Sequence, residues 1–308
     1  MPWPRHPARW MADRANRIVG SMLVCKLSGC DVATCHTRRP VSSPPSPPFE
    51  PLAGSNGQPT ATIRHGDWVL RPAGPWTPAV HALLRHLERV GFPAAPRVVG
   101  DGHDDQGREV LSWIPGRIAH PRPYTEEQIW QVGQLLGALH QATATFQAPP
   151  EAVWQPWTLH RRAPDTVISH CNVGPWHVIL DQGRPVGLID WSLAGPTDPL
   201  DEVAVSGWWN AQLHDDDIAK RVGLPDAATR ARQLQAFLDG YGLPAADRVG
   251  LVDRMIEFAI RDSAALADIK QITPESTDST TLWTLAWQTR AAAWMLRHRS
   301  MLQRAIQG

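Results

Sequence analysis

The stretch VISHCNVGPWHVILDQGRPVGLIDW, residues 167–191, decides the fold. Its apolar runs, Val167-Ile168, Val178–Leu180 and Val186–Ile189, are bounded by Gly, Pro and Asp. That pattern predicts short strands joined by tight turns. Polar side chains stand where the chain leaves these strands, namely His170, Asn172, His177 and Asp190. Loops held by a rigid scaffold often carry chemistry, so we predict a functional loop here rather than an ordinary hairpin.

Length and composition limit the class of protein. A chain of 308 residues is long enough for one large or two modest domains with a real core. With 30 basic and 30 acidic residues the formal net charge is +0, which gives no electrostatic argument for a nucleic-acid partner. No apolar run approaches the roughly 18 residues needed to span a bilayer. The 4 cysteines form no disulfide framework. We therefore expect a cytoplasmic protein with neither a nucleic-acid nor a membrane partner.

The first 50 residues lack the patterns of a folded domain. They begin with a polar, basic segment and end in the Pro/Ser-rich RRPVSSPPSPPFEP, which is typical of a linker. The short apolar run Ile18–Val24 is interrupted by Gly20 and Ser21, so it does not read as a signal peptide. Residues 1–50 predict either a disordered extension or a translation start placed too early.

Residues 51–116 predict a small sheet with one helix, the N-terminal lobe of a two-lobed protein. The segment PLAGSNGQPTATIRHGDWVLRP contains two turns and reads as three strands. Thr77 and Pro78 are the expected cap and first residue of a helix whose apolar side chains recur every three or four residues up to Gly91. A DGHDDQG turn and the apolar residues that flank it predict a further hairpin.

Residues 117–308 predict a larger, mostly helical lobe that contains the opening stretch. Thr125 caps an amphipathic helix that starts with two glutamates and ends at LGALHQAT. The helices expected after the opening stretch lie at about residues 200–213, 215–222, 226–240, 244–270 and 279–305. The expected fold class is therefore α+β, with a small antiparallel N-terminal sheet and a helical C-terminal lobe.

Four segments together resemble a known family. The loop from His170 to His177 is similar to a catalytic loop of the form H-x-D, four residues and Asn, and Ile189-Asp190-Trp191 is similar to a metal-binding Asp segment that reads IDW or IDF. LGALHQAT is similar to the helix before that loop, and residues 195–204 resemble the GDPxxDLA segment after it. In this order the segments resemble the aminoglycoside phosphotransferase and choline kinase-like family, from about residue 50 to the C-terminus.

The resemblance implies a two-lobed, protein-kinase-like fold and transfer of a phosphoryl group to a hydroxyl of a small molecule, cationic or neutral. It implies ATP or another nucleoside triphosphate as donor, with Mg²⁺ or Mn²⁺. Such transfer depends on positioning and charge neutralisation more than on covalent chemistry. Asp190 would hold the metal, which prefers oxygen ligands when it is Mg²⁺. His170 would order the loop through hydrogen bonds.

Nucleotide contacts are implied in the N-terminal lobe. Arg71 stands where the family has its phosphate-contacting Lys, and a guanidinium can pair with phosphate through two nitrogens. Gly54 and Gly57 would let backbone N–H groups approach the phosphates. Residues 109–113 resemble the hinge segment of the family, whose backbone, here at Glu109, Val110 and Trp113, would hydrogen-bond adenine.

Two positions depart from the family pattern. Asn172 stands at the catalytic Asp, and its neutral amide can orient a hydroxyl but cannot accept its proton. His177 stands at the second metal ligand, and imidazole suits Mn²⁺ or Zn²⁺ better than Mg²⁺. A third difference concerns the partner of Arg71, since the first turn of the helix at 80–90 offers His81 and no Glu.

Three hypotheses remain open from the sequence. The first is a slow or metal-shifted phosphotransferase, and the second is a kinase-fold binding, immunity or regulatory protein without turnover. The third is a transition-metal site at His170, Cys171 and His177. Two features could serve a cationic acceptor or be purely structural: His214–Asp217, otherwise a solvated helix start, and Trp208-Trp209, otherwise core.

Overall fold

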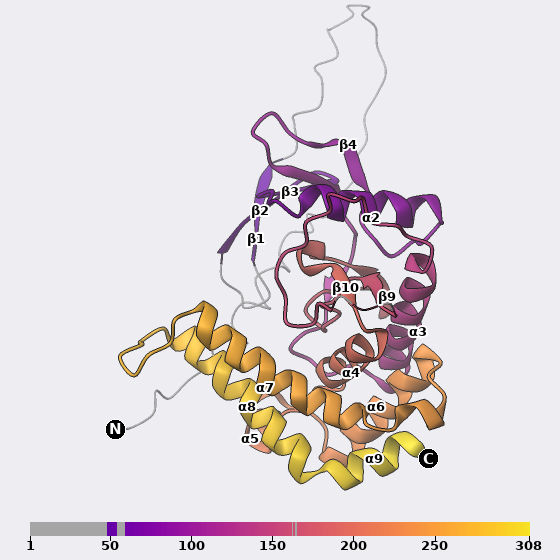
Figure 1. Cartoon of the computed structure of the whole chain (residues 1–308), viewed down its shortest axis with the longest axis vertical. Helices are drawn as coiled ribbons and strands as arrows, with labels where there is room; N and C mark the ends of the chain where they lie inside the picture. Colours follow the sequence, from indigo (N-terminus) through magenta and orange to yellow (C-terminus); the bar gives the residue numbers. More distant parts are fainter. Residues whose placement is uncertain (1–47, 54–58, 162, 164) are drawn as a thin grey trace, which may run out of the picture.

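The computed structural model describes residues 48–53, 59–161, 163 and 165–308, and the expected two-lobed α+β fold is confirmed (Figure 1). The N-terminal lobe is an antiparallel sheet with the strand order β1-β2-β3-β5-β4. Its strands are β1 (Phe49–Ala53), β2 (Pro59–His65), β3 (Trp68–Arg71), β4 (Val98–His103) and β5 (Glu109–Ser112). The predicted phosphate-loop residues Gly54 and Gly57, like almost all of the predicted extension 1–50, lie outside the described residues.

Among the described residues the helix of this lobe is α2 (Thr77–Arg89), whose apolar face is fully buried through Val80, Leu83, Leu84 and Leu87. The predicted Thr77 cap is wrong. The N-cap residue is Trp76, without a side-chain cap, because the Thr77 hydroxyl instead accepts a hydrogen bond from the Gly74 N–H at 2.9 Å. Pro78 does lie in the first turn, as its fixed φ favours.

The second lobe contains the opening stretch between helices. Helix α3 (Glu126–Thr143) has the expected Thr125 cap, completed by Gln128 into a capping box. Strand β7 (Val167–Ser169) pairs with β10 (Gly195–Thr197), a strand that the sequence did not reveal. Strands β8 (Val178–Asp181) and β9 (Arg184–Leu188) form the predicted hairpin, and β6 (Arg117–Ile118) joins β8.

Helices fill the rest of the chain, and none of those described is long and apolar enough to cross a membrane. They are α4 (Pro199–Asn210), α5 (Asp216–Val222), α6 (Ala227–Tyr241), α7 (Leu251–Ile269), α8 (Ser279–Arg297) and α9 (Arg299–Gln307). The single helix expected at 279–305 is divided at His298. The break lets α9 turn and bury Leu302 and Ile306, with α6 as its main neighbour (Figure 1).

Helices α3 and α6 cross at backbone contact, and glycines make the crossing possible. A Cβ on Gly133 would lie 2.0 Å from the carbonyl oxygen of Phe237, and a Cβ on Gly240 would lie 1.9 Å from that of Trp130. Real Cβ atoms do not approach an oxygen so closely, so only glycine fits at both positions. The crossing brings His140 of α3 beside Tyr241 of α6, which matters for the site below.

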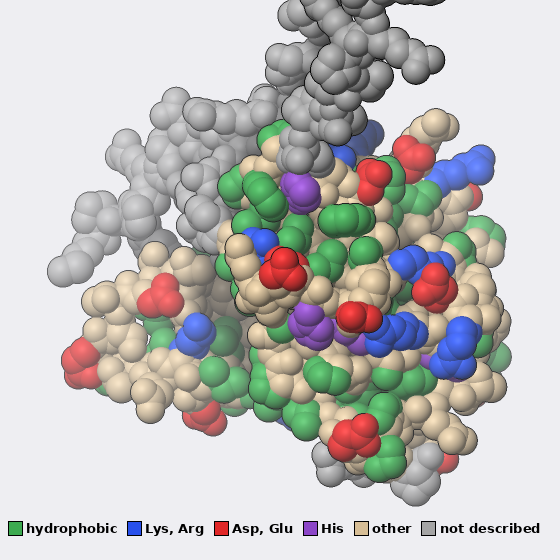
Figure 2. All heavy atoms as spheres, turned by 90° about the horizontal axis from the view of Figure 1, so that it is seen from above, with side chains coloured by type: hydrophobic (Ala, Val, Ile, Leu, Met, Phe, Trp, Pro, Cys, Tyr) green, Lys and Arg blue, Asp and Glu red, His purple; other side chains and the backbone are tan. Residues whose placement is uncertain are grey.

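Figure 2 shows positive and negative side chains interspersed on the face seen from above. This mixture accords with the formal net charge of +0.

Candidate active site

The strand ends bring the predicted polar residues together under the N-terminal sheet. His170 follows β7 and Asp190 follows β9. The His170 ring is fully buried; its Nε2–H donates to the Ile189 carbonyl at 3.0 Å, and its Nδ1 accepts from the Asn172 N–H at 3.2 Å. Both nitrogens are therefore used to tie the loop to the Asp190 segment. Burial lowers the pKa of His170 to about 4, so the ring is neutral at pH 7.

Asn172 and His177 are joined through the backbone of the loop. The His177 Nδ1–H donates to the Asn172 carbonyl at 3.0 Å, which leaves Nε2 pointing at the Asp190 carboxylate with 3.5 Å between Nε2 and Oδ2. Burial lowers the pKa of His177, although the Asp190 charge acts in the opposite direction. The Asn172 side chain makes no hydrogen bond within the described part of the chain and is only half-buried.

Asp190 is held in a backbone conformation that few residues other than glycine adopt, with φ 60°. Its Oδ1 accepts from the Ser192 hydroxyl at 2.5 Å and from Arg71 Nη1 at 3.1 Å. Burial acts to raise the pKa of the carboxyl group, but the charges of His177 and Arg71 outweigh it and bring the pKa down to about 2. Asp190 is therefore an anion with Oδ2 directed at His177.

Arg71 joins the two lobes. It contacts Asp190 with Nη1, and its Nε donates to Glu109 Oε2. Glu109 Oε1 in turn lies 2.9 Å from His81 Nε2 on α2. Burial lowers the pKa of Arg71 less than its two carboxylate partners raise it, so the guanidinium stays charged.

The prediction that the backbones of Glu109 and Val110 hydrogen-bond adenine is wrong. Both residues lie in β5, which is flanked by β3 on one edge and β4 on the other, and the Glu109 side chain faces Arg71. Trp113 follows the strand, but its N–H donates to the Asp67 carbonyl at 2.7 Å, and that of Ser112 donates to Arg97 at 2.8 Å. The Trp113 ring packs against the Arg64 guanidinium, 4.5 Å from its Cζ.

Glu202 of α4 organises the loop, a role that sequence reasoning missed. Its Oε1 accepts from the Cys171 N–H at 2.6 Å, where Cys171 has a φ of 61°, and its Oε2 lies 2.9 Å from His140 Nε2. His140 Nδ1 contacts the Tyr241 hydroxyl at 2.9 Å. Burial acts to raise the pKa of Glu202, but the hydrogen bond with His140 lowers the pKa by more than burial raises it. The carboxylate is therefore charged. The signal was present, since Glu202 falls in the segment that resembles GDPxxDLA.

The hypothesis of a transition-metal site at His170, Cys171 and His177 is wrong. Both His170 nitrogens are occupied, and Cys171 Sγ contacts the carbonyls of Ser169 and Gly195 at 3.6 and 3.4 Å. Burial raises the pKa of the Cys171 thiol, which keeps it protonated. No group of three or more His, Cys, Asp or Glu side chains suited to a metal occurs among the residues that the structure describes.

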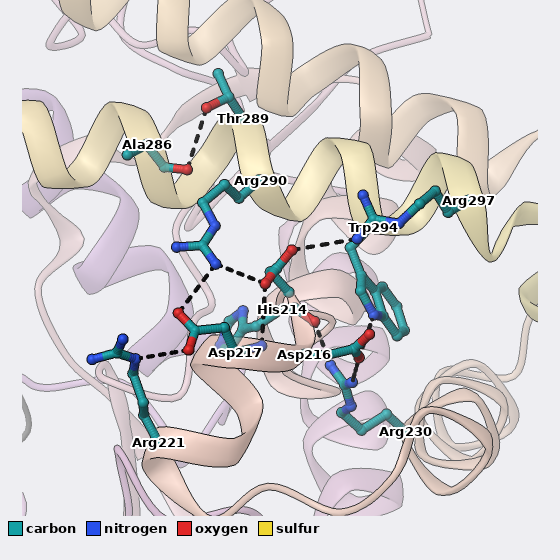
Figure 3. A network of polar contacts seen from close by, with 11 residues as sticks. His214, Asp216, Asp217, Arg221, Arg230, Ala286, Thr289, Arg290, Trp294 and Arg297 are labelled. Atoms are coloured by element: carbon teal, nitrogen blue, oxygen red, sulfur yellow. Dashed lines mark hydrogen bonds and ion pairs between the residues drawn. The ribbon is translucent and has the colours of Figure 1, made fainter.

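The acidic segment at the start of α5 is matched by the chain's own arginines (Figure 3). Asp215 accepts from Arg290 at 2.8 Å and from Arg297 at 3.3 Å, and Asp217 accepts from Arg221 at 3.1 Å. Arg230 and the Trp294 indole N–H reach Asp216. The segment joins α5 to α6 and α8, so the geometry favours its structural role over attraction of a cationic acceptor.

Trp208 and Trp209 belong to the hydrophobic core. Trp208 is fully buried and stacks on Trp287 with ring centroids 5.5 Å apart, and Trp209 packs against Trp176 of the loop at 5.3 Å. The burial of both rings therefore supports a structural role for this pair rather than contact with a cationic acceptor.

Stability should fall as the pH falls from about 6.5 to 4, because buried histidines fold in the neutral form. Burial lowers the pKa of His120 and His170 to about 4 and that of His214 to about 3. Unfolded imidazoles titrate near 6.5, so at pH 5 these three histidines bind about three more protons in the unfolded chain than in the folded chain. Urea unfolding at pH 7, 6 and 5 measures this uptake, and His214→Gln should reduce it by about one proton. A free energy of unfolding that is constant over this range would contradict the expectation.

The model of the phosphotransferase enzyme family matches residues 60–162 and 143–252, which together cover more than half of the chain. The chain belongs to the phosphotransferase enzyme family. This result confirms the resemblance seen in the sequence. That Asn172 and His177 depart from the family's loop pattern stays a prediction, and Arg71, Asp190 and Glu202 contact that loop and its flanking segment in the geometry described above.

Individual relatives agree with this membership. The trifolitoxin immunity protein of Rhizobium leguminosarum bv. trifolii is 48% identical over 253 residues, covering 82% of this chain and 97% of that protein. Among solved structures, an amicoumacin kinase in complex with AMP-PNP, Ca²⁺ and Ami has a TM-score of 0.59 at 15% identity, with 80% of this chain and 87% of that chain covered. A microcompartment-associated aminopropanol kinase has a TM-score of 0.53 at 13% identity, with 80% and 90% covered. At these identities the solved structures establish the kinase-type fold alone.

Proposed function

We propose that the protein is a slow, divalent-metal-dependent phosphotransferase that moves the γ-phosphoryl group of ATP, or of another nucleoside triphosphate, to a hydroxyl of a small molecule. The observation that carries the proposal is the group formed by Arg71, Asp190 and His177 at the junction of the two lobes. A fixed cation lies beside a carboxylate whose second oxygen faces an imidazole nitrogen at 3.5 Å. Family membership and the kinase-type fold support this function.

The donor atoms fit a divalent metal. His177 carries its proton on Nδ1, so in the neutral ring the Nε2 lone pair faces the Asp190 Oδ2 lone pairs at 3.5 Å. A cation between the two lone pairs relieves their opposition: a proton on His177 does so as an ion pair, and a divalent metal ion would do so as an ion shared by both side chains. An imidazole ligand favours Mn²⁺ or another transition ion over Mg²⁺. A divalent cation held there would neutralise charge on phosphate oxygens.

The remaining groups have separate tasks in this proposal. Arg71 holds a phosphate, since its Nη2 has no partner within the described part of the chain, while Nε and Nη1 are engaged. Asn172 orients the acceptor hydroxyl through its unengaged amide, and His170 and Glu202 keep the loop in place. No side chain in this arrangement replaces the missing carboxylate base, which is why we expect slow transfer.

Nucleotide binding should depend on a divalent ion and on Asp190. Titration calorimetry with ATP should give tighter binding with Mn²⁺ than with Mg²⁺, because His177 is one of the two ligands. Asp190→Asn should weaken metal-dependent binding about 10-fold or more, since it removes the anionic ligand. Asp181→Asn, an exposed carboxylate at the end of β8, is the matched control and should leave the affinity unchanged. Equal binding with and without a metal would contradict the proposed site.

A second candidate is an immunity protein that binds nucleotide or a small ligand without turnover. It is favoured by the 48% identity to a protein named for immunity and by Asn172 at the position of the catalytic base. Turnover separates the two candidates: release of ADP in the presence of a hydroxyl acceptor supports the enzyme, and nucleotide binding without any release supports the binding protein.

A further inference from the structure

We propose that Glu109, held by His81, is the carboxylate that positions Arg71, the phosphate-binding cation. Glu109 lies in the sheet, whereas in protein kinases the corresponding glutamate belongs to a helix. The inference rests on the proposed function, because it assigns Arg71 to a phosphate. In protein kinases the cation on the third strand is oriented by a glutamate of the neighbouring helix.

Helix α2 cannot supply that glutamate. It has no acidic residue in its first turn, and Glu88, near its end, is exposed. The buried ionisable residue of α2 nearest its first turn is His81, whose Nε2 lies 2.9 Å from Glu109 Oε1 rather than contacting Arg71 itself. The helix therefore contributes a neutral or cationic partner where a carboxylate is expected.

Glu109 supplies the missing charge. Its residue is 1% exposed, and each carboxylate oxygen has one partner, Oε2 with Arg71 and Oε1 with His81. A buried carboxylate without partners would be strongly destabilising, so this geometry requires both neighbours. Burial acts to raise the pKa of Glu109, but the bond from His81 and the charge of Arg71 outweigh it, and the carboxylate remains ionised.

The sheet fixes this pair. Arg71 and Glu109 are directly opposite each other on the antiparallel strands β3 and β5, so their side chains share one face. Gly102 on β4 gives the His81 ring its space: with φ 93° and no side chain, it avoids a Cβ that would lie 2.5 Å from that ring. Strands β3, β4 and β5 and helix α2 therefore all contribute to the contact between Arg71, Glu109 and His81.

An arginine is required for this arrangement. Nε donates to Glu109 while Nη1 of the same planar group reaches Asp190 at 3.1 Å, so the plane of the guanidinium is set by two carboxylates on different lobes. A lysine has one nitrogen and no plane to fix. Arg71 and Glu109 therefore form a matched pair, and each explains the other's departure from the kinase pattern.

The test moves the carboxylate back to the helix. Glu109→Gln should weaken binding of ATP with Mn²⁺ by about 10- to 100-fold, the loss expected for a hydrogen bond to a charged group. The double variant H81E/E109Q should recover most of that loss, because it restores a negative charge beside Arg71. Glu88→Gln, an exposed carboxylate on the same helix, is the control and should bind like the natural protein.

A second readout does not need nucleotide. The Arg71 Nε–H signal in ¹⁵N NMR should exchange slowly with water in the natural protein, quickly in Glu109→Gln and slowly again in the double variant. Unchanged exchange and affinity in Glu109→Gln would overturn the inference, as would a folded double variant without recovery. If the natural protein binds no nucleotide with either metal, the proposed function fails. The NMR series still tests whether Glu109 positions the Arg71 guanidinium. If Glu109→Gln does not fold, Glu109→Asp, too short to reach both partners, replaces it in both measurements.

Discussion

The Asn172→Asp variant should transfer phosphoryl groups about 10²–10⁴-fold faster than the natural protein, which is the usual contribution of a general base. The change is small in structural terms. The backbone of residue 172 makes its bonds with His170 and His177 through N–H and carbonyl, and the side-chain amide has no partner among the described residues. A carboxylate of the same shape would meet the acceptor hydroxyl from the same loop conformation.

The measurement is ADP release with a panel of hydroxyl acceptors, in Mg²⁺ and in Mn²⁺. Adding His177→Asn to Asn172→Asp should shift the preferred metal toward Mg²⁺, because an amide oxygen replaces an imidazole nitrogen. Asn172→Ala is the control that lacks both the base and the hydroxyl contact. If the natural protein is inert and the double variant is active, the natural protein is a binding protein on a phosphotransferase scaffold. If neither variant gains activity, the loop is not the catalytic site.

The Gly240→Ala variant should lose about 3 kcal/mol of stability, at the upper end of what an overpacked core commonly costs. Alanine normally stabilises a helix by about 1 kcal/mol relative to glycine, so the expected sign is reversed. The reason is the α3–α6 crossing, where the new Cβ would lie 1.9 Å from the Trp130 carbonyl oxygen and the obstacle is backbone. Thermal unfolding should show a Tm lower by roughly 6–12 °C.

The matched control lies on the partner helix. A Cβ on Gly137 would meet the Tyr241 carbonyl oxygen at 3.0 Å, so Gly137→Ala should cost less than Gly133→Ala, whose Cβ would lie at 2.0 Å. Equal effects at the two positions would show that the helices can separate freely. Because the crossing also places Tyr241 beside His140, the more damaging variants should loosen the contact between Glu202 and the loop.

The parts of the fold that follow from local pattern were predictable. The capping box at Thr125, the hairpin that leads to Asp190 and the order of the helices all arise from residues close together in the chain. The division at His298 and the cap at Trp76 were not, because each depends on a contact that competes with the helix signal.

The site residues were predictable only where they lie in one short segment of the chain. His170, Asn172, His177 and Asp190 lie within 21 consecutive positions, and the structure brings them together. The role of Glu109 was predicted wrongly, because its contact with Arg71 depends on pairing between β3 and β5, which joins residues 38 positions apart. Glu202 acts across 31 positions. Spacing along the chain contains no signal for such contacts when a carboxylate stands at an unexpected position.

The pairing of Arg71 with Glu109 across neighbouring strands also bears on control. Kinases can be switched off by swinging a helix outward, which withdraws the glutamate from its cation. Here the carboxylate belongs to the same sheet as the cation, so a movement of α2 would remove His81 and leave the Arg71–Glu109 contact in place. An outward movement of α2 would therefore not by itself separate this cation from its carboxylate.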